Sequence, residues 1–136
     1  MIFVDTSAWY ARYAPRDANH SAAKAFHLAN HLPLVTTDYV IDETLTLLKA
    51  RGNSEIAFRI GPKLLTAQLA RLIHVTEHDV ESAWLLFAAH RDKEWSFTDC
   101  VSYAVMKRLQ IIEAFAFDEH FNHLALQQFG RRAKLF

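Results

Sequence analysis

The sequence has little of what builds a disulfide-stabilised, secreted or membrane-spanning protein. Its 136 residues include one cysteine, three glycines and three prolines, and 15 basic residues balance 15 acidic ones. The single Cys100 cannot form an internal disulfide, fits a reducing compartment, and is expected to be buried among apolar neighbours. No apolar run approaches the roughly 20 residues of a membrane span. Asp5 interrupts the first apolar run, so no signal peptide is expected. These absences favour a soluble cytoplasmic protein.

Several common enzyme signatures are also missing. The chain contains no GxxxxGK[ST] or GxGxxG motif, which argues against nucleotide binding through a glycine-rich loop. It also contains no GxSxG motif, which argues against a hydrolase with a nucleophilic serine. The zero net charge means that any contact with a polyanion must come from local cations or a bound metal. The histidine pairs His27/His31 and His120/His123 have no cysteine partners and no HExxH motif. We therefore expect solvated histidines rather than a zinc site.

The composition is that of one compact domain over residues 1–136, because 51% of the residues are hydrophobic and the chain is long enough to bury a core. Short apolar runs alternate with helical patterns, which predicts an α/β fold with a parallel sheet and helices on both faces. We expect strands at 1–4, from 34, at 72–75 and at 111–117. Helices are expected over 7–13, 17–31, 38–51, from 54, over 77–90 and over 97–109.

Local signals add detail to three of these helices. Gly61-Pro62 interrupts the stretch that begins at Ser54, so we expect a break or kink there. Ser96, with Asp99 three residues later, forms a capping box that opens a helix. In the helix over 77–90, the spacing predicts that the inward-facing residues are Val80, Trp84, Phe87 and Ala88.

Four acidic residues stand at the ends of apolar runs or within apolar helices, far apart in the sequence: Asp5, Glu43, Asp99 and Asp118. Each has an ordinary explanation when taken alone, because aspartate suits helix starts and turns and a helical glutamate is usually solvated. However, a carboxylate placed where a buried element meets solvent is costly to desolvate without a positive partner. Asp5 and Asp118 also follow expected strands, and ligand sites of such sheets lie beyond the carboxyl ends of the strands.

We therefore expect the four acids to gather at one site that binds a hard divalent cation. Oxygen ligands without histidine or cysteine favour Mg²⁺ or Mn²⁺ over zinc. Metal ions held by carboxylates can activate a water molecule and stabilise the leaving oxygen of a phosphodiester. Asp42, next to Glu43, points roughly 100° away around the helix and is not expected to take part.

The segments that carry these acids resemble the motifs of PIN-domain proteins, specifically the VapC-type toxin ribonucleases of VapBC toxin–antitoxin pairs. They are FVDTSAW, TTDYVIDETLTLL, SFTDCVSYAVM and AFAFDEHF, and the similarity covers nearly the whole chain in order, spacing and flanking hydrophobicity. The resemblance implies a parallel sheet, usually five-stranded, and Mg²⁺- or Mn²⁺-dependent endoribonuclease activity that hydrolyses RNA phosphodiester bonds. Carried over by position, it implies that the catalytic, metal-binding acids are Asp5, Glu43, Asp99 and Asp118.

The resemblance assigns supporting roles as well. Thr6 and Thr98 match hydroxyl positions beside the site, where they would orient a carboxylate or a water molecule. The chain departs from the family pattern at Ala116, where relatives often carry serine or threonine two residues before the last acid.

The resemblance also implies two kinds of protein partner: a second copy of the chain in a homodimer, and a cognate VapB-type antitoxin whose C-terminal segment covers the active site. Apolar residues that would face either a partner or the core are Trp9, Tyr10, Phe26, Phe58 and Ile60. The RNA substrate needs cationic contacts to its phosphates. The candidates for these contacts are Arg12, Arg16, Lys107, Arg108, Arg131 and Arg132.

Two other functions stay open from the sequence. One is a catalytically silent PIN-like module that binds RNA or a protein; members of that kind usually lose one or more of the acids, whereas this chain keeps all four. The other is a metal-dependent DNA nuclease or phosphatase, which would use the same acids.

Overall fold

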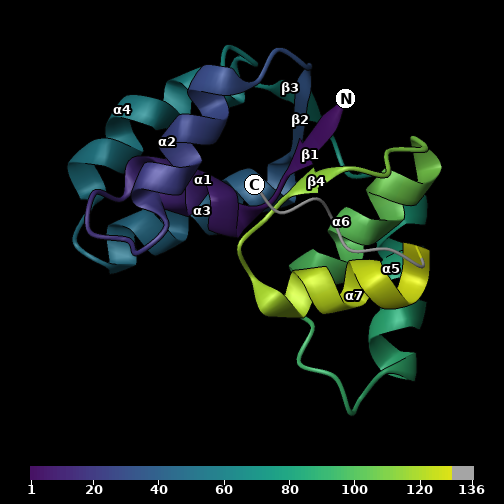
Figure 1. Ribbon diagram of the computed structural model, residues 1–136. Coiled ribbons are helices and arrows are strands. Elements are labelled where there is room, and N and C mark those ends of the chain that lie inside the picture. The colour runs from purple at the N-terminus through teal and green to yellow at the C-terminus, as the bar shows by residue number, and fades with distance from the viewer. Residues whose placement is uncertain (130–136) are drawn as a thin grey trace.

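A four-stranded parallel sheet lies between two groups of helices in the computed structural model, which describes residues 1–129 (Figure 1). The strand order is β3-β2-β1-β4. Strand β1 (Ile2–Val4) pairs with β2 (Leu34–Thr37) on one side and with β4 (Ala114–Phe115) on the other, and β2 pairs with β3 (Arg71–Ile73). The α/β fold with a parallel sheet covered on both faces is confirmed, with four strands in this part of the chain rather than about five.

The helices divide between the two faces of the sheet. One group contains α1 (Thr6–Tyr13), α2 (His20–Ala29), α3 (Asp38–Ala50) and α4 (Ser54–Leu65); the other contains α5 (Glu77–Ala89), α6 (Phe97–Arg108) and α7 (Glu119–Phe129) (Figure 1). No helix within residues 1–129 is long and apolar enough to cross a membrane.

Buried apolar residues of the central strands form the main core. Phe3, Val4 and Val35 have no exposed surface, as expected for strands covered on both faces. The ring of Phe115 in β4 stacks on Phe26 of α2 with 3.8 Å between centroids. A second apolar cluster lies under α5 and α6 and contains the fully buried Cys100, which confirms the expected buried thiol.

Two expected strands differ from those observed. The strand expected at 111–117 is only two residues long, because only Ala114 and Phe115 pair with β1, opposite Phe3 and Val4. The strand expected at 72–75 is found at 71–73. Beyond it the chain leaves the sheet, and the amide of Val75 donates instead to Asp38 Oδ1 at 3.1 Å.

The expected break at Pro62 is wrong, because α4 continues through it to Leu65. Proline removes the hydrogen bond to the carbonyl four residues earlier. That carbonyl belongs to Phe58, which is 62% exposed, so water can replace the missing donor. Gly61 faces Leu45 of α3, and a Cβ at this position would lie in ordinary van der Waals contact, 3.6 Å from a Leu45 methyl carbon.

The inward face expected for α5 is wrong for its two aromatic residues, whereas Val80 and Ala88 are half-buried. Trp84 and Phe87 are exposed, whereas Asp79 and Ala83 are buried. Asp79 accepts two hydrogen bonds of 2.8 Å from Arg108 of α6, and this ion pair turns the Asp79 face of α5 toward α6. A buried charge with a partner on another helix therefore sets the rotation that periodicity alone assigned to the aromatic residues.

Candidate active site

The first carboxylate of the site, Asp5, comes immediately after the central strand β1 in the sequence. Asp5 caps α1, and its Oδ2 accepts hydrogen bonds from the amide of Ser7 at 3.1 Å and from its hydroxyl at 2.7 Å. The side chain is buried, with 2% of its surface exposed. Its other oxygen, Oδ1, is buried and has no hydrogen-bond partner in the part of the chain that the structure describes. An unpaired buried carboxylate oxygen is costly, which makes Asp5 unusual for a simple helix cap.

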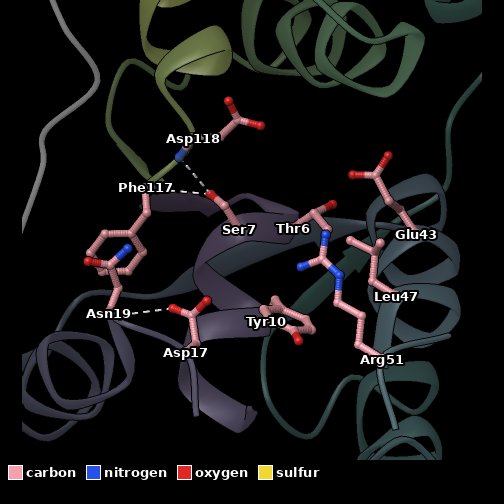
Figure 2. A pocket seen from close by; sticks show the side chains of 10 residues that line it. All are labelled: Thr6, Ser7, Tyr10, Asp17, Asn19, Glu43, Leu47, Arg51, Phe117 and Asp118. Atoms are coloured by element: carbon pink, nitrogen blue, oxygen red, sulfur yellow. Dashed lines mark hydrogen bonds between the residues drawn. The ribbon is translucent and has the colours of Figure 1, made fainter. Parts of the chain in front are cut away.

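Ser7 ties the ends of two neighbouring strands together. While its hydroxyl donates to Asp5, the same oxygen accepts from the amides of Phe117 at 2.9 Å and Asp118 at 3.1 Å (Figure 2). A hydroxyl offers one donor and two acceptor lone pairs, so Ser7 uses all of its hydrogen-bonding capacity here. The distance between Asp5 and the backbone of Asp118 is therefore fixed by one side chain.

A cavity of about 290 Å³ is lined by Thr6 and Ser7, which follow Asp5 in the chain, and by Glu43 and Asp118, among others (Figure 2). Asp5 and Asp99 are not among its lining residues. Glu43 reaches it from α3, a helix whose start is fixed by a hydrogen bond from the amide of Val40 to the side chain of Thr37. Glu43 and Asp118 are half-buried. Asp118 also caps α7, because its Oδ1 accepts from the amide of His120 at 2.8 Å.

Asp99 adds a fourth carboxylate from the first turn of α6. The expected capping box is present: the amide of Asp99 donates to Ser96 Oγ at 3.0 Å, and Asp99 Oδ2 accepts from the amide of Ser96 at 2.9 Å. Asp99 is 5% exposed. Burial, followed by the negative charge of Asp5, raises its pKa to about 8, and the charges of Asp118 and Glu43 act in the same direction.

The pKa of Asp5 shows the same mutual influence. Burial, with smaller contributions from the charges of Asp118 and Glu43, raises this pKa to about 6 against the opposing hydrogen bonds from Ser7. Within residues 1–129, none of the four carboxylates forms an ion pair with a lysine, arginine or histidine. The four acids thus share one region in which negative charge is not compensated by the protein.

The donor set of this region fits a hard divalent cation, although no ready-made cage is present. Among the described residues, no three His, Cys, Asp or Glu side chains form a group that could hold a metal ion as they stand. The buried Oδ1 of Asp5 has no hydrogen-bond partner among the described residues, so this oxygen is free to bind a cation. Asp5 and Asp99, with Glu43 and Asp118 at the cavity, are the residues that would hold Mg²⁺ or Mn²⁺.

The histidine pairs offer no competing zinc site. His31, His120 and His123 are exposed, as expected. His27 is only half-buried rather than fully solvated, because its ring packs against Trp9 with 5.7 Å between centroids and its Nδ1 lies 2.9 Å from the carbonyl of Ala23.

The supporting threonines differ in their placement. Thr6 lines the cavity, and its buried hydroxyl has no partner within residues 1–129. Thr98 lies half-buried in the first turn of α6 and is not among the residues that line the cavity. Asp42 is exposed and outside the cavity, as expected for the neighbour that points away.

The cations suggested for RNA contacts differ in their surroundings. Arg108 is occupied by Asp79, whereas Arg12 contacts the Tyr13 ring, with its guanidinium carbon 4.9 Å from the ring centroid. Arg131 and Arg132 lie outside the described residues. Of the apolar residues considered for a partner surface, Trp9, Phe26 and Ile60 are core residues and Tyr10 is half-buried, whereas Phe58 is exposed.

Two residues of the cavity were missed by sequence reasoning. The bridging role of Ser7 depends on amides 110 and 111 residues away, although Ser7 stands within the FVDTSAW motif. Arg51 lines the cavity from the end of α3, eight residues after Glu43 and four after Leu47. Positions four and eight residues apart share one side of a helix, so this spacing was the signal that could have found it.

Comparison with known proteins agrees with this geometry. The PIN domain family matches residues 2–126. The 23S rRNA-specific endonuclease VapC20 of Mycobacterium tuberculosis is 38% identical over 122 residues, which are 90% of this chain and 92% of that protein. A VapC ribonuclease of Archaeoglobus fulgidus is 27% identical over 88% of this chain and 78% of its own length. The crystal structure of Mycobacterium tuberculosis VapC20, described as a sarcin–ricin loop cleaving toxin, superimposes with a TM-score of 0.85 at 35% identity, over 91% of this chain and 95% of that one. The chain belongs to the PIN-domain family and, within it, to the VapC group.

Proposed function

We propose that the protein is an Mg²⁺- or Mn²⁺-dependent endoribonuclease that hydrolyses RNA phosphodiester bonds as the toxin of a type II toxin–antitoxin pair. The observation that carries the proposal is the buried, unpaired Oδ1 of Asp5, together with three further carboxylates that influence one another electrostatically and have no cationic partner in residues 1–129. The names of the relatives, an endonuclease and a ribonuclease, support RNA cleavage.

Each site residue has a distinct role in this proposal. A divalent cation bound by the carboxylates would polarise the scissile phosphate and lower the pKa of a water molecule. Asp5, Asp99, Glu43 and Asp118 would hold this cation with their carboxylate oxygens. Ser7 holds Asp5 and the Asp118 backbone at a fixed spacing. The hydroxyls of Thr6 in α1 and Thr98 in α6 orient a carboxylate or a water molecule.

We further propose that residues 1–136 form one PIN domain, that the protein acts in the cytoplasm as a homodimer, and that a VapB-type antitoxin covers the active site. Exposed apolar side chains supply candidate contact surfaces on two helices. They are Phe58 and Leu65 on α4 and Trp84, Leu85 and Phe87 on α5.

The test is a cleavage assay with matched carboxylate variants. Purified 23S rRNA is the first substrate, because it is the RNA named for VapC20, and single-stranded DNA and a small phosphodiester serve as competitors. The protein is expected to cut RNA with Mg²⁺ or Mn²⁺ and not with a chelator. Glu43→Gln should abolish cleavage, whereas Asp42→Asn, one residue away but exposed, should leave it unchanged.

Equal activity of the Glu43→Gln and Asp42→Asn variants would refute the assignment of the site. Tight binding of RNA that stays intact at saturating metal would point instead to a non-cleaving module. Preferential hydrolysis of DNA or of the small phosphodiester would move the activity to another substrate class.

A further inference from the structure

The carboxylate cavity continues into a second hollow along α1 and the end of α3. This second hollow has a volume of about 500 Å³ and shares Tyr10, Asp17 and Arg51 with the first. Because three residues line both hollows, they form one groove, which runs from Glu43 and Asp118 toward Arg16 and Asn53.

Arg51 lies where the two hollows meet, and its position is set by the way α3 ends. Gly52 adopts a positive φ of 82°, and the amide of Asn53 donates to the carbonyl of Leu48 at 2.8 Å, which closes the last turn. The guanidinium carbon of Arg51 lies 5.0 Å from the centroid of the Tyr10 ring. Figure 2 shows the Arg51 side chain reaching from α3 into the groove, toward Thr6. Arg51 is exposed, and its cation–π contact with Tyr10 places the guanidinium against a ring that lines the same groove.

This arginine is held in place without a carboxylate partner. In residues 1–129 it forms no ion pair, even though Glu43 and Asp17 line the same groove. Asp17 Oδ2 instead accepts from the amide of Asn19 at 2.9 Å. Arg108, by contrast, is fully engaged by Asp79. Arg51 is thus a positioned guanidinium whose donors are free for an external anion, and its planar fork suits a phosphate group.

We infer that the Arg51–Tyr10 pair is a binding subsite for a backbone phosphate of the RNA strand, adjacent to the phosphate at the carboxylates. The inference rests on the proposed function. Four uncompensated carboxylates repel a polyanion, so the strand needs a nearby cation to hold it against the site. Arg51 supplies this cation on the same helix face as Glu43, and Tyr10 acts as its positioning residue.

The first experiment measures binding without cleavage. In the Asp99→Asn protein with a chelator present, labelled single-stranded RNA is titrated at several salt concentrations. Arg51→Ala should weaken binding about tenfold, as for the loss of one charge-assisted contact. The salt slope should fall by about 0.7, the value for one phosphate of a single strand. Arg51→Lys should restore part of the affinity, and Arg59→Ala, an exposed arginine of α4 outside the groove, should change neither quantity.

The second experiment locates the phosphate with RNAs that carry one neutral methylphosphonate at successive positions. At one position next to the cleaved bond, neutralisation should raise KM of the wild-type protein about tenfold and leave KM of Arg51→Ala unchanged. Equal sensitivity of the two proteins at every position, or unchanged binding by Arg51→Ala, would overturn the subsite. A wild-type protein that binds RNA through Arg51 but cuts none would leave the subsite standing and refute the proposed function.

Discussion

Replacing Asp99 with asparagine is expected to abolish cleavage and at the same time stabilise the metal-free protein. The pKa of Asp99 rises from 3.8 to about 8 in the folded protein, through burial and then the charge of Asp5. Below about pH 4 both folded and unfolded chains hold the proton, and Asp99 costs nothing. Between pH 4 and pH 8 the unfolded chain releases the proton that the folded chain retains, so stability falls as the pH rises.

The size of the effect follows from this pKa difference. Each unit corresponds to 1.36 kcal/mol, so the folded protein carries a penalty of at most about 4 kcal/mol at pH 7. Water entry and side-chain movement reduce it, and we expect Asp99→Asn to gain roughly 2–3 kcal/mol. The amide oxygen of asparagine can still accept from the amide of Ser96, which preserves the capping box.

Asp79 is the matched control for this substitution. It also occupies the third position of a capping box, with Thr76, and it is 1% exposed. Burial favours its neutral form, but hydrogen bonds from Arg108 and Thr76 outweigh burial and hold its pKa below the ordinary value. Asp79→Asn should therefore destabilise the protein by about 1.5–3 kcal/mol, the contribution of hydrogen bonds to charged groups.

Urea unfolding of both variants with a chelator, at pH 5, 6, 7 and 8, tests the reasoning. Asp99→Asn should be more stable than the wild-type protein and less dependent on pH, and Asp79→Asn should be less stable at every pH. Saturating Mg²⁺ should stabilise the wild-type protein by about 2.7 kcal/mol at 100 times its Kd and stabilise Asp99→Asn less. If both variants are destabilised alike without metal, Asp99 acts only as a helix cap, and the idea that its ionisation destabilises the folded protein is refuted.

Three further expectations concern the scaffold of the site and its core. Ser7→Ala removes three hydrogen bonds and leaves the amides of Phe117 and Asp118 without an acceptor. It should therefore lower the free energy of unfolding by about 2–4 kcal/mol and reduce cleavage. Ser54→Ala is the control, and equal unfolding curves of the two variants would contradict the bridging role of Ser7. Phe115→Ala should cost about 3–5 kcal/mol in urea unfolding, because the ring stacks on Phe26; a loss below 1 kcal/mol would show that this contact is dispensable. Cys100, with its pKa raised to about 12 chiefly by burial, should resist a thiol reagent at pH 8 until urea is added; prompt labelling of the folded protein would contradict its burial.

Much of the fold follows from signals that are local in the sequence. The alternation of strands and helices needs only the apolar runs, and the starts of α3 and α6 need only the caps at Thr37 and Ser96. The misjudged features depend on partners elsewhere in the chain. The rotation of α5 is set by Arg108, 29 residues after Asp79, and no periodicity within α5 contains that information. The length of β4 likewise depends on its pairing with Phe3 and Val4 of β1, which lie far away in the sequence.

The same distinction applies to the site. The four carboxylates could be named from the sequence because Asp5, Asp99 and Asp118 stand where elements meet, Glu43 lies within an apolar helix, and all four fall in the PIN-like motifs. The structure brings all four under mutual electrostatic influence. Ser7 and Arg51 could not be assigned in this way. The first acts on backbone amides across the sheet, and the second depends on the Gly52 turn and on the ring of Tyr10.

What separates a structural carboxylate from a site carboxylate in this protein is the counter-charge rather than the local motif. Asp79 and Asp99 have the same capping box, the same helix position and similar burial, so neither sequence nor secondary structure distinguishes them. Asp79 meets Arg108 and is neutralised within the fold, whereas Asp99 meets Asp5 and is made harder to ionise. A fold that only needed a helix cap would gain stability by placing a cation near Asp99. Among the described residues, Arg51 lines the same cavity as Glu43 and Asp118 but contacts Tyr10 instead of a carboxylate. In the function proposed above, the four acids thereby stay available for a metal ion, and the arginine stays available for the substrate.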